Sequence, residues 1–267
     1  MKVAASRDED GDIDFVEVAP WTILIAEDSP LWRGLVRSGI EAFDRTSIVL
    51  EAKNGREALD VLSERPVDIA FVDLAMPEID GAEVVERVKH HGKMPFFVVI
   101  SVTSDAQAIT RMRKLAAYDY LVKPFGPEAI TPVLQTFERV SQRTRILIVD
   151  DSGTARTIVA RILTHSIFNL EVTQAADGVS ALENYARRAP DIVFLDMNMP
   201  WIDGADTLRL LRAVNPHVRV VLMSASSDIA ERARELGAAA YLKKPFFAGD
   251  LDRTVHQLFE LRLPYSD

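Results

Sequence analysis

The sequence predicts two α/β domains in tandem, each with a parallel sheet that helices cover on both faces. Three observations support this fold class. The 267 residues suit two domains of the commonest size, one set of motifs occurs twice, and short apolar runs alternate with amphipathic stretches inside each copy. That alternation, with strands that are apolar throughout, is typical of a parallel sheet buried between helices.

The repeat is the clearest feature of the chain. The string ILIAEDSP at Ile23–Pro30 returns as ILIVDDSG at Ile146–Gly153, and the same offset carries FVDLAMPEIDG at Phe71–Gly81 onto FLDMNMPWIDG at Phe194–Gly204. Two copies, each about a domain long, indicate duplicated domains rather than a solenoid. The linker between them is short and has no Gly/Ser-rich spacer.

Later motifs keep the two copies in register. Ser101 corresponds to Ser224 at the same offset, and YLVKPF at Tyr120–Phe125 matches YLKKPF at Tyr241–Phe246. The offset shortens between these two matches. The first copy therefore holds extra residues, which we expect in a helix that begins near Asp105.

These matches set the expected domain boundaries. Residues 1–19 form an acidic tail that we expect to be mobile. Residues 20–143 form the first domain, residues 144–263 the second, and residues 264–267 a short tail.

The elements follow from the pattern of the second copy. Short runs rich in Val, Ile and Leu predict five strands, at residues 145–149, 170–173, 192–195, 218–223 and 239–242. Between them lie amphipathic stretches such as residues 178–188, in which Val179, Leu182 and Ala186 fall on one helical face. The first copy repeats this order, and its last helix, around residues 133–141, leads into the next strand.

Composition excludes several classes of function. The chain has no cysteine, which excludes disulfides and thiolate metal sites. Its net charge of -9, without a basic stripe, predicts no direct binding to nucleic acid. Since there is neither a membrane-spanning apolar run nor a signal peptide, we expect a cytoplasmic protein without membrane contact.

Polar side chains follow the apolar strands at the ends where open α/β sheets bind ligands. In the first copy they are Glu27, Asp28, Asp73, Ser101 and Lys123, and in the second Asp150, Asp151, Asp196, Ser224 and Lys244. Because parallel strands end at the same edge of a sheet, each set is expected to converge on one acidic pocket.

Gathered carboxylates repel one another unless a cation neutralises them. Mg²⁺ suits a site that offers a few carboxylates and leaves room for water and a phosphoryl oxygen. One carboxylate can then act as a nucleophile, while the lysine and the serine hydroxyl contact phosphoryl oxygens.

Two enzyme classes fit the sequence poorly. Phosphatases that use a strand-end aspartate as nucleophile resemble D-x-D, and this chain has Ala75 and Asn198 at the position of the second acid. Dinucleotide-binding enzymes need G-x-G-x-x-G after the first strand, and neither copy has it. We therefore predict no separate catalytic domain.

The ED or DD pair, the D-x-x-M-P-x-x-D-G stretch, the serine after an apolar strand and the Y-L-x-K-P-F string occur together in both copies. They resemble the receiver domain of bacterial two-component response regulators, over about Trp21 to Leu261. The resemblance implies two flavodoxin-like (βα)5 domains, each with a five-stranded parallel sheet of order 2-1-3-4-5.

The same resemblance implies roles for the acidic residues. Asp73 and Asp196 would accept a phosphoryl group from a sensor histidine kinase or a histidine phosphotransfer protein. Each domain would bind one Mg²⁺, with Glu27 or Asp150 nearby in the acidic pocket. The ligands would be Asp28, Asp73 and the carbonyl of Ala75 in the first domain, and Asp151, Asp196 and the carbonyl of Asn198 in the second.

A second group of residues would contact the phosphoryl group and switch the domain. It consists of Ser101, Lys123 and Tyr120 in the first copy and Ser224, Lys244 and Tyr241 in the second. By resemblance, the serine swings toward the phosphate and the tyrosine turns into the vacated space. This changes the face formed by the fourth helix, fifth strand and fifth helix, a face that would also allow a homodimer.

The function implied is that of a response regulator that signals to an unknown downstream protein through phosphorylation-dependent contacts. Two alternatives remain open. The chain would be a phosphate sink or relay intermediate, or it would be the receiver portion of a longer regulator with a C-terminal output domain, such as a cyclic-dinucleotide enzyme or a DNA-binding module.

The first copy departs from the family pattern beside its aspartate. Val102 stands where the second copy has Ala225, and Trp32 stands where it has Ala155. Large side chains at the entrance of a close-packed site hinder a phosphoryl donor, because the donor must approach in line with the attacking oxygen of the aspartate. We therefore expect slower phosphorylation of Asp73 than of Asp196.

Overall fold

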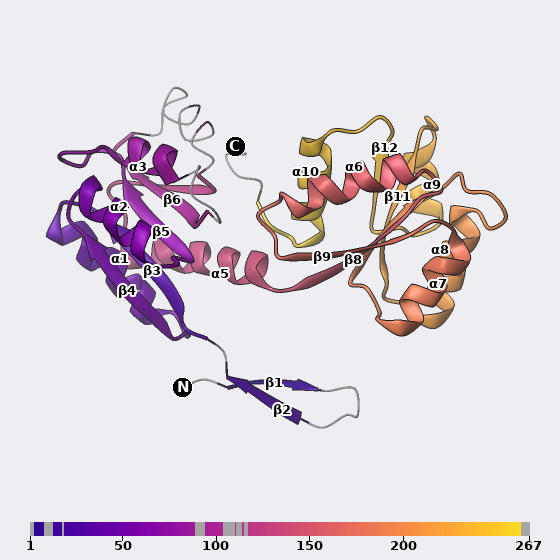
Figure 1. Ribbon diagram of the computed structural model, residues 1–267, viewed down its shortest axis with the longest axis horizontal. Helices are drawn as coiled ribbons and strands as arrows, with labels where there is room; N and C mark the ends of the chain where they lie inside the picture. The colour runs from indigo at the N-terminus through magenta and orange to yellow at the C-terminus, as the bar shows by residue number, and fades with distance from the viewer. Residues whose placement is uncertain are drawn as a thin grey trace. The chain divides into compact units, whose positions relative to one another are not determined.

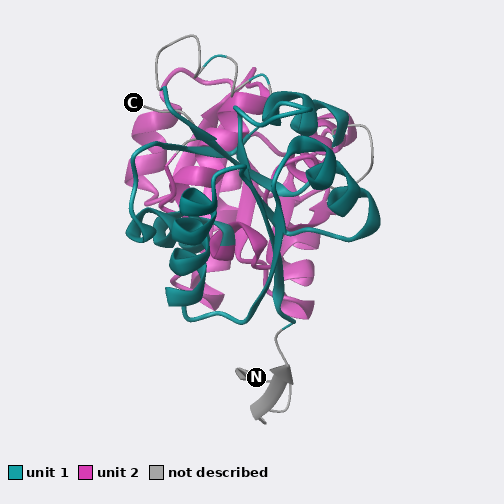
Figure 2. Ribbon diagram, turned by 90° about the vertical axis from the view of Figure 1, so that its left-hand side faces the viewer, with its two compact units in different colours: residues 1–137, 264–267 teal, residues 138–263 magenta. Residues whose placement is uncertain are grey.

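The computed structural model describes residues 3–7, 13–17, 19–88, 94–103, 110, 114 and 117–262. The chain divides into two compact units, residues 1–137 with 264–267 and residues 138–263 (Figure 2). The division falls inside α5 (Ile130–Ser141), the last helix of the first copy. The expected tail at residues 264–267 lies outside the described residues.

The first unit contains a five-stranded parallel sheet (Figure 1). Its strand order is β4-β3-β5-β6-β7, which is 2-1-3-4-5 when counted within the unit, so the predicted flavodoxin-like fold is confirmed. The strands are β3 (Trp21–Ala26), β4 (Ser47–Ala52), β5 (Ile69–Asp73), β6 (Phe96–Ser101) and β7 (Asp119–Val122).

Helices connect these strands. They are α1 (Pro30–Ala42), α2 (Gly55–Glu64), α3 (Gly81–Val88), the 3-10 turn η1 (Pro127–Ala129) and α5. Of the helix expected to begin near Asp105, the structure describes only residues 110 and 114, and both are helical.

The second unit repeats this architecture with the order β9-β8-β10-β11-β12. Its strands are β8 (Thr144–Val149), β9 (Leu170–Ala175), β10 (Ile192–Asp196), β11 (Arg219–Ser224) and β12 (Ala240–Lys243). Its helices are α6 (Gly153–Thr164), α7 (Gly178–Arg187), α8 (Gly204–Val214), α9 (Ile229–Glu235) and α10 (Ala248–Leu258).

The segment expected to be an acidic tail contains two strands that the sequence did not predict. β1 (Val3–Arg7) pairs antiparallel with β2 (Ile13–Glu17). The acidic composition of the segment dominated the prediction, although Ile13, Phe15 and Val16 are β-branched or aromatic residues that favour strands.

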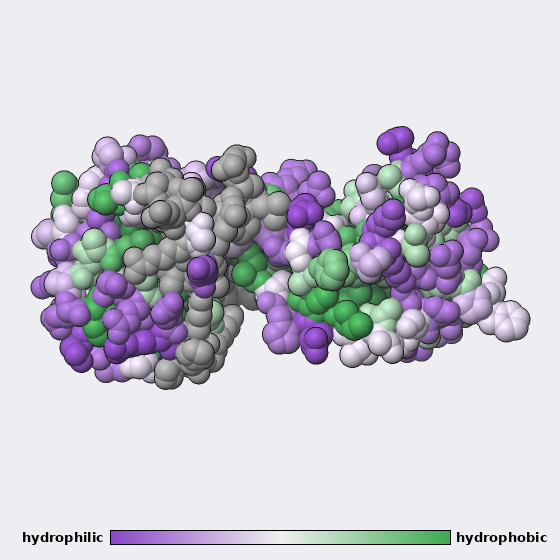
Figure 3. Space-filling model, turned by 90° about the horizontal axis from the view of Figure 1, so that it is seen from above, coloured by the Kyte–Doolittle hydropathy of each residue, from purple (hydrophilic) through white to green (hydrophobic). Residues whose placement is uncertain are grey.

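The apolar strands form the cores of the two units. β5, β6 and β10 are buried along their whole length, as expected for parallel strands covered on both faces. Hydrophilic side chains cover much of the face drawn in Figure 3. None of the helices in the described part of the chain combines the length and the apolar composition that a bilayer span requires.

Two glycines let a helix begin directly against a strand end. A Cβ added to Gly81 would lie 2.1 Å from the carbonyl oxygen of Asp73, and one added to Gly204 would lie 2.4 Å from that of Asp196. In both cases the obstacle is backbone, which cannot rotate away. The two helices α3 and α8 therefore pack closely on the strands that carry these aspartates.

We expect Gly81→Ala to destabilise the first unit by about 3 kcal/mol, because the strand end or the helix must move. Gly34→Ala is the matched control within the same unit. Gly34 lies in α1 with no atom within 4 Å of an added Cβ, so alanine there is expected to stabilise by about 0.5 to 1 kcal/mol. Urea unfolding measures both changes, and equal free energies of unfolding for the two variants would contradict this account.

Candidate functional site

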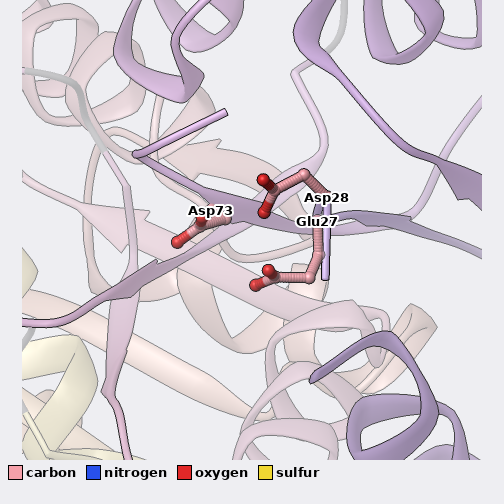
Figure 4. A group of neighbouring side chains, drawn as sticks. All are labelled: Glu27, Asp28 and Asp73. Atoms are coloured by element: carbon pink, nitrogen blue, oxygen red, sulfur yellow. The ribbon is translucent and has the colours of Figure 1, made fainter. Parts of the chain in front are cut away.

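The sheet register brings three carboxylates of the first unit together. Glu27 and Asp28 follow β3 directly, and β5 ends on Asp73. β3 and β5 are neighbouring parallel strands, with Ala26 opposite Val72, so their ends lie at the same edge. The carboxylate oxygens of the three acids lie within 4.8 Å of one another. Figure 4 shows these side chains beside one another at the sheet edge.

The second unit forms an equivalent cluster. Asp150 and Asp151 follow β8, β10 ends on Asp196, and Val149 lies opposite Leu195 in the register. The oxygens of its three carboxylates also lie within 4.8 Å of one another. We call these groups the first cluster (Glu27, Asp28 and Asp73) and the second cluster (Asp150, Asp151 and Asp196).

A lysine that follows the last strand of each sheet contacts two acids of its cluster. Lys123 Nζ lies 2.7 Å from Glu27 Oε2 and 3.2 Å from Asp73 Oδ1. Lys244 Nζ donates hydrogen bonds to Asp150 Oδ2 and Asp196 Oδ1, both at 2.7 Å. In each cluster, two of the three carboxylates thus contact the ammonium group of one lysine.

Burial raises the pKa of three carboxyl groups in these clusters. It raises the pKa of Asp73, and the charge and hydrogen bond of Lys123 offset that rise only in part. Burial also raises the pKa of Asp196 against the opposing effect of Lys244, and raises the pKa of Glu27. For Glu27, Asp73 and Asp196, burial therefore outweighs the favourable contact with the lysine.

The pKa of Lys244 reflects its contacts with the second cluster. Burial alone lowers this pKa, but the hydrogen bonds to Asp150 and Asp196 and the negative charges of these acids together outweigh burial, so the pKa is raised overall. The ammonium group is therefore held in its charged form beside the two acids.

The two serines are buried and bonded to their own loops. Ser101 Oγ accepts a hydrogen bond from the backbone N–H of Thr103 at 3.2 Å, and Ser224 Oγ accepts one from Ser226 at 3.1 Å. In the second cluster the backbone N–H of Asn198 donates to Asp196 Oδ2 at 3.2 Å. The loop after Asp196 therefore lies close to the carboxylate of this residue.

The two tyrosines lie in different environments. Tyr241 on β12 is 46% exposed. Tyr120 on β7 is partly buried and packs against the apolar core of the first unit. The two copies thus share their polar residues but differ in how this aromatic side chain is placed.

Two arginines at the site were not singled out from the sequence. Arg33, in α1 and 8% exposed, donates from Nη1 to the backbone oxygens of Glu27 at 2.6 Å and Asp28 at 2.9 Å. Arg156, at the equivalent position of α6, donates to the backbone oxygen of Asp150 at 2.6 Å. Both guanidinium groups fix the backbone of an acidic pair. Their matching positions in the repeat were the signal that could have revealed them.

Comparison with known proteins gives a consistent result. The response regulator receiver domain family matches residues 23–135 and 146–256. Sporulation initiation phosphotransferase F of Bacillus subtilis (strain 168) is 34% identical over 123 residues, which cover 44% of this chain and 95% of that protein. Transcriptional regulatory protein PrrA of Mycobacterium leprae (strain TN) is 39% identical over 120 residues, 44% of this chain and 51% of PrrA. The chain thus matches about half the length of PrrA.

A solved structure resembles the chain over both copies. It is that of a probable two-component system response regulator/GGDEF domain protein, with a TM-score of 0.62 and 24% identity. The match covers 90% of this chain and 99% of that one. It is a likeness of fold.

Proposed function

The chain belongs to the response regulator receiver domain family, as two receiver domains in tandem, and we propose that it accepts phosphoryl groups on Asp73 and Asp196. The donor would be a sensor histidine kinase or a histidine phosphotransfer protein. One observation carries the proposal: in both domains a lysine ammonium lies against the aspartate at the end of the third strand, at 3.2 Å and 2.7 Å. Receiver domains are not catalytic domains by themselves, and the function supported is two-component response regulation.

In the proposed reaction each aspartate is the nucleophile. A carboxylate oxygen of Asp196 attacks the phosphorus of a phosphohistidine that carries a proton on its other ring nitrogen, an O–P bond forms while the P–N bond breaks, and the histidine leaves as a neutral imidazole. The ammonium of Lys244 turns from the carboxylates to a phosphoryl oxygen. The hydroxyl of Ser224 leaves the N–H of Ser226 and donates to another phosphoryl oxygen. Asp73, Lys123 and Ser101 have the same parts in the first domain.

The clusters suit Mg²⁺, which receiver domains generally use. In each cluster the structure describes three carboxylates with oxygens within 4.8 Å and one lysine ammonium beside them, which leaves a negative charge that a hard divalent cation neutralises. We propose direct ligation by Asp28, Asp73 and the carbonyl of Ala75 in one domain, and by Asp151, Asp196 and the carbonyl of Asn198 in the other. Glu27 and Asp150 would act partly through water. When bound, the ion supplies positive charge to the phosphoryl oxygens.

Phosphorylation would be read out at the tyrosines. Once the hydroxyl of Ser224 turns toward the phosphoryl group, Tyr241 would move from its exposed position into the vacated space. This would change the face of α9, β12 and α10, where a downstream protein or a second copy would bind. In the first domain Tyr120 on β7 would play this part.

Phosphorylation by acetyl phosphate tests the proposal without a cognate kinase. In Mg²⁺, intact-mass spectra are expected to show up to two added phosphoryl groups per chain, and EDTA is expected to abolish both. A folded chain that gains none in Mg²⁺ would exclude the proposal. Phosphorylation that persists in EDTA would exclude the role of the metal.

The likeness to a sporulation phosphotransferase, of whose length the match covers 95%, favours a second candidate function. The chain would then be a relay or sink that passes its phosphoryl groups back to a histidine. Affinity capture with and without beryllofluoride separates the two functions: a partner gained or lost on activation supports signalling, and an unchanged set supports the relay. The names of PrrA and of the GGDEF protein favour a third candidate, control of a DNA-binding or cyclic-dinucleotide output domain in a longer chain.

A further inference from the structure

An aromatic ring covers the lysine of the first domain. Trp32 lies in the first turn of α1, and the centroid of its indole ring is 5.5 Å from Lys123 Nζ. Phe125 packs on the same indole, with ring centroids 5.1 Å apart. Cations within about 6 Å of an indole are attracted by the negative face of the ring. The ammonium group is thus held by the indole as well as by Glu27 and Asp73.

The second domain lacks this cover. Ala155 stands at the position of Trp32, and among the residues that the structure describes no ring lies over Lys244. The side chain of Lys123 is 10% exposed and that of Lys244 is 28% exposed. The lysines therefore differ in what shields them from water.

The two domains differ in the exposure of the lysine side chain and hardly in that of the aspartate side chain. The side chains of Asp73 and Asp196 are almost equally buried, at 3% and 5% exposed. Val102, the other bulky residue that distinguishes the first copy, is 68% exposed. The two sites therefore do not differ mainly in how far bulky side chains bury the aspartate.

We propose that the Trp32–Phe125 pair holds Lys123 on the carboxylates of Glu27 and Asp73 and thereby makes Asp73 the slower phosphoryl acceptor. This inference rests on the proposed function. Shielding from water strengthens the ion pairs that the lysine makes. The lysine must leave those carboxylates to meet a phosphoryl oxygen, so each contact that holds it in place opposes the reaction. Trp32 is thus a residue that sets the preference between the two domains.

A reciprocal exchange of side chains tests the inference. With Asp196→Asn leaving only the first site, Trp32→Ala is expected to speed phosphorylation of Asp73 by acetyl phosphate about two- to fivefold, the weight of one cation–π contact. With Asp73→Asn leaving only the second site, Ala155→Trp is expected to slow phosphorylation of Asp196. Val102→Ala, in the first background, is the control and is expected to have the smaller effect.

Beryllofluoride affinity distinguishes a held lysine from a narrowed entrance. Because the cover stabilises the unphosphorylated state, Trp32→Ala is expected to tighten binding of beryllofluoride to the first domain by a similar factor, as measured by fluorine NMR in Mg²⁺. A faster reaction at unchanged affinity would overturn the inference in favour of simple steric obstruction.

Further outcomes separate this inference from the proposed function. If both sites are phosphorylated but neither exchange changes a rate, the proposed role of the Trp32–Phe125 pair is wrong. The proposal that Asp73 and Asp196 accept phosphoryl groups then still stands. If neither site is phosphorylated in the unaltered folded chain, both fail. If Trp32→Ala does not fold, Ala155→Trp carries the test in the second domain, and an unchanged rate there overturns the inference.

Discussion

The Asp196→Asn variant is expected to carry one phosphoryl group per chain where the unaltered chain carries two, and the double variant with Asp73→Asn is expected to carry none. The amide fills the same space as the carboxylate but is neutral and not nucleophilic. The measurement is the intact mass after treatment with acetyl phosphate and Mg²⁺. This is the largest effect that the proposed chemistry predicts.

Asp203→Asn is the matched control in the same loop. Asp203 caps α8 by accepting a hydrogen bond from the backbone N–H of Asp206 at 2.8 Å, and asparagine caps helices equally well. We expect this variant to keep both phosphoryl groups. A double variant at positions 73 and 196 that still gains phosphoryl groups would place the acceptor elsewhere in the chain.

The second large effect concerns stability without metal. In EDTA we expect Asp73→Asn to raise the free energy of unfolding at neutral pH by about 1 to 2 kcal/mol, because it removes a buried charge from a crowded cluster. Lys123 keeps its closer partner, Glu27, at 2.7 Å. In saturating Mg²⁺ we expect the unaltered chain to have the higher free energy of unfolding of the two. An ion that binds only the folded state stabilises the unaltered chain more than the Asp73→Asn variant, which has lost a proposed ligand.

The free energy of unfolding in EDTA is expected to depend on pH through the buried carboxyl groups. Burial raises the pKa of Asp73, Asp196 and Glu27 in the folded chain, so the folded state takes up protons before the unfolded state as the pH falls. The contribution of these groups to the free energy of unfolding in EDTA therefore increases as the pH falls from neutral toward the ordinary carboxyl pKa. Asp73→Asn should reduce that slope. Urea unfolding at two pH values measures it, and a less stable Asp73→Asn variant in EDTA at neutral pH would contradict the account.

The sequence predicted the fold because its signals are local and occur twice. Apolar runs such as Ile192–Leu195 form strands almost where expected, with β10 one residue longer at Asp196. The repeat aligned the polar residues of the two copies. Since parallel strands end at the same edge, the grouping of Glu27, Asp28 and Asp73 could be inferred before their distances were known. Their chemical roles remain predictions.

Other features depend on side-chain directions that spacing alone does not determine. In the sequence nothing distinguishes Arg33 from a surface arginine, whereas in the structure it is buried in α1 and its guanidinium contacts the backbone of Glu27. The sequence predicts that Trp32 crowds the approach to Asp73, which stays a prediction, and the contact of its ring with Lys123 was not foreseen. The strands β1 and β2 were missed because charge outweighed the strand preference of a few residues.

Chemical mapping of the acyl phosphate identifies which aspartates accept the phosphoryl group. Borohydride reduces an aspartyl phosphate to homoserine, which peptide mass spectrometry locates in the sequence. After treatment with acetyl phosphate and Mg²⁺, we expect homoserine at positions 73 and 196, and at neither position when EDTA is present. Homoserine at any other aspartate, or a phosphorylated chain with none at these two positions, would contradict it.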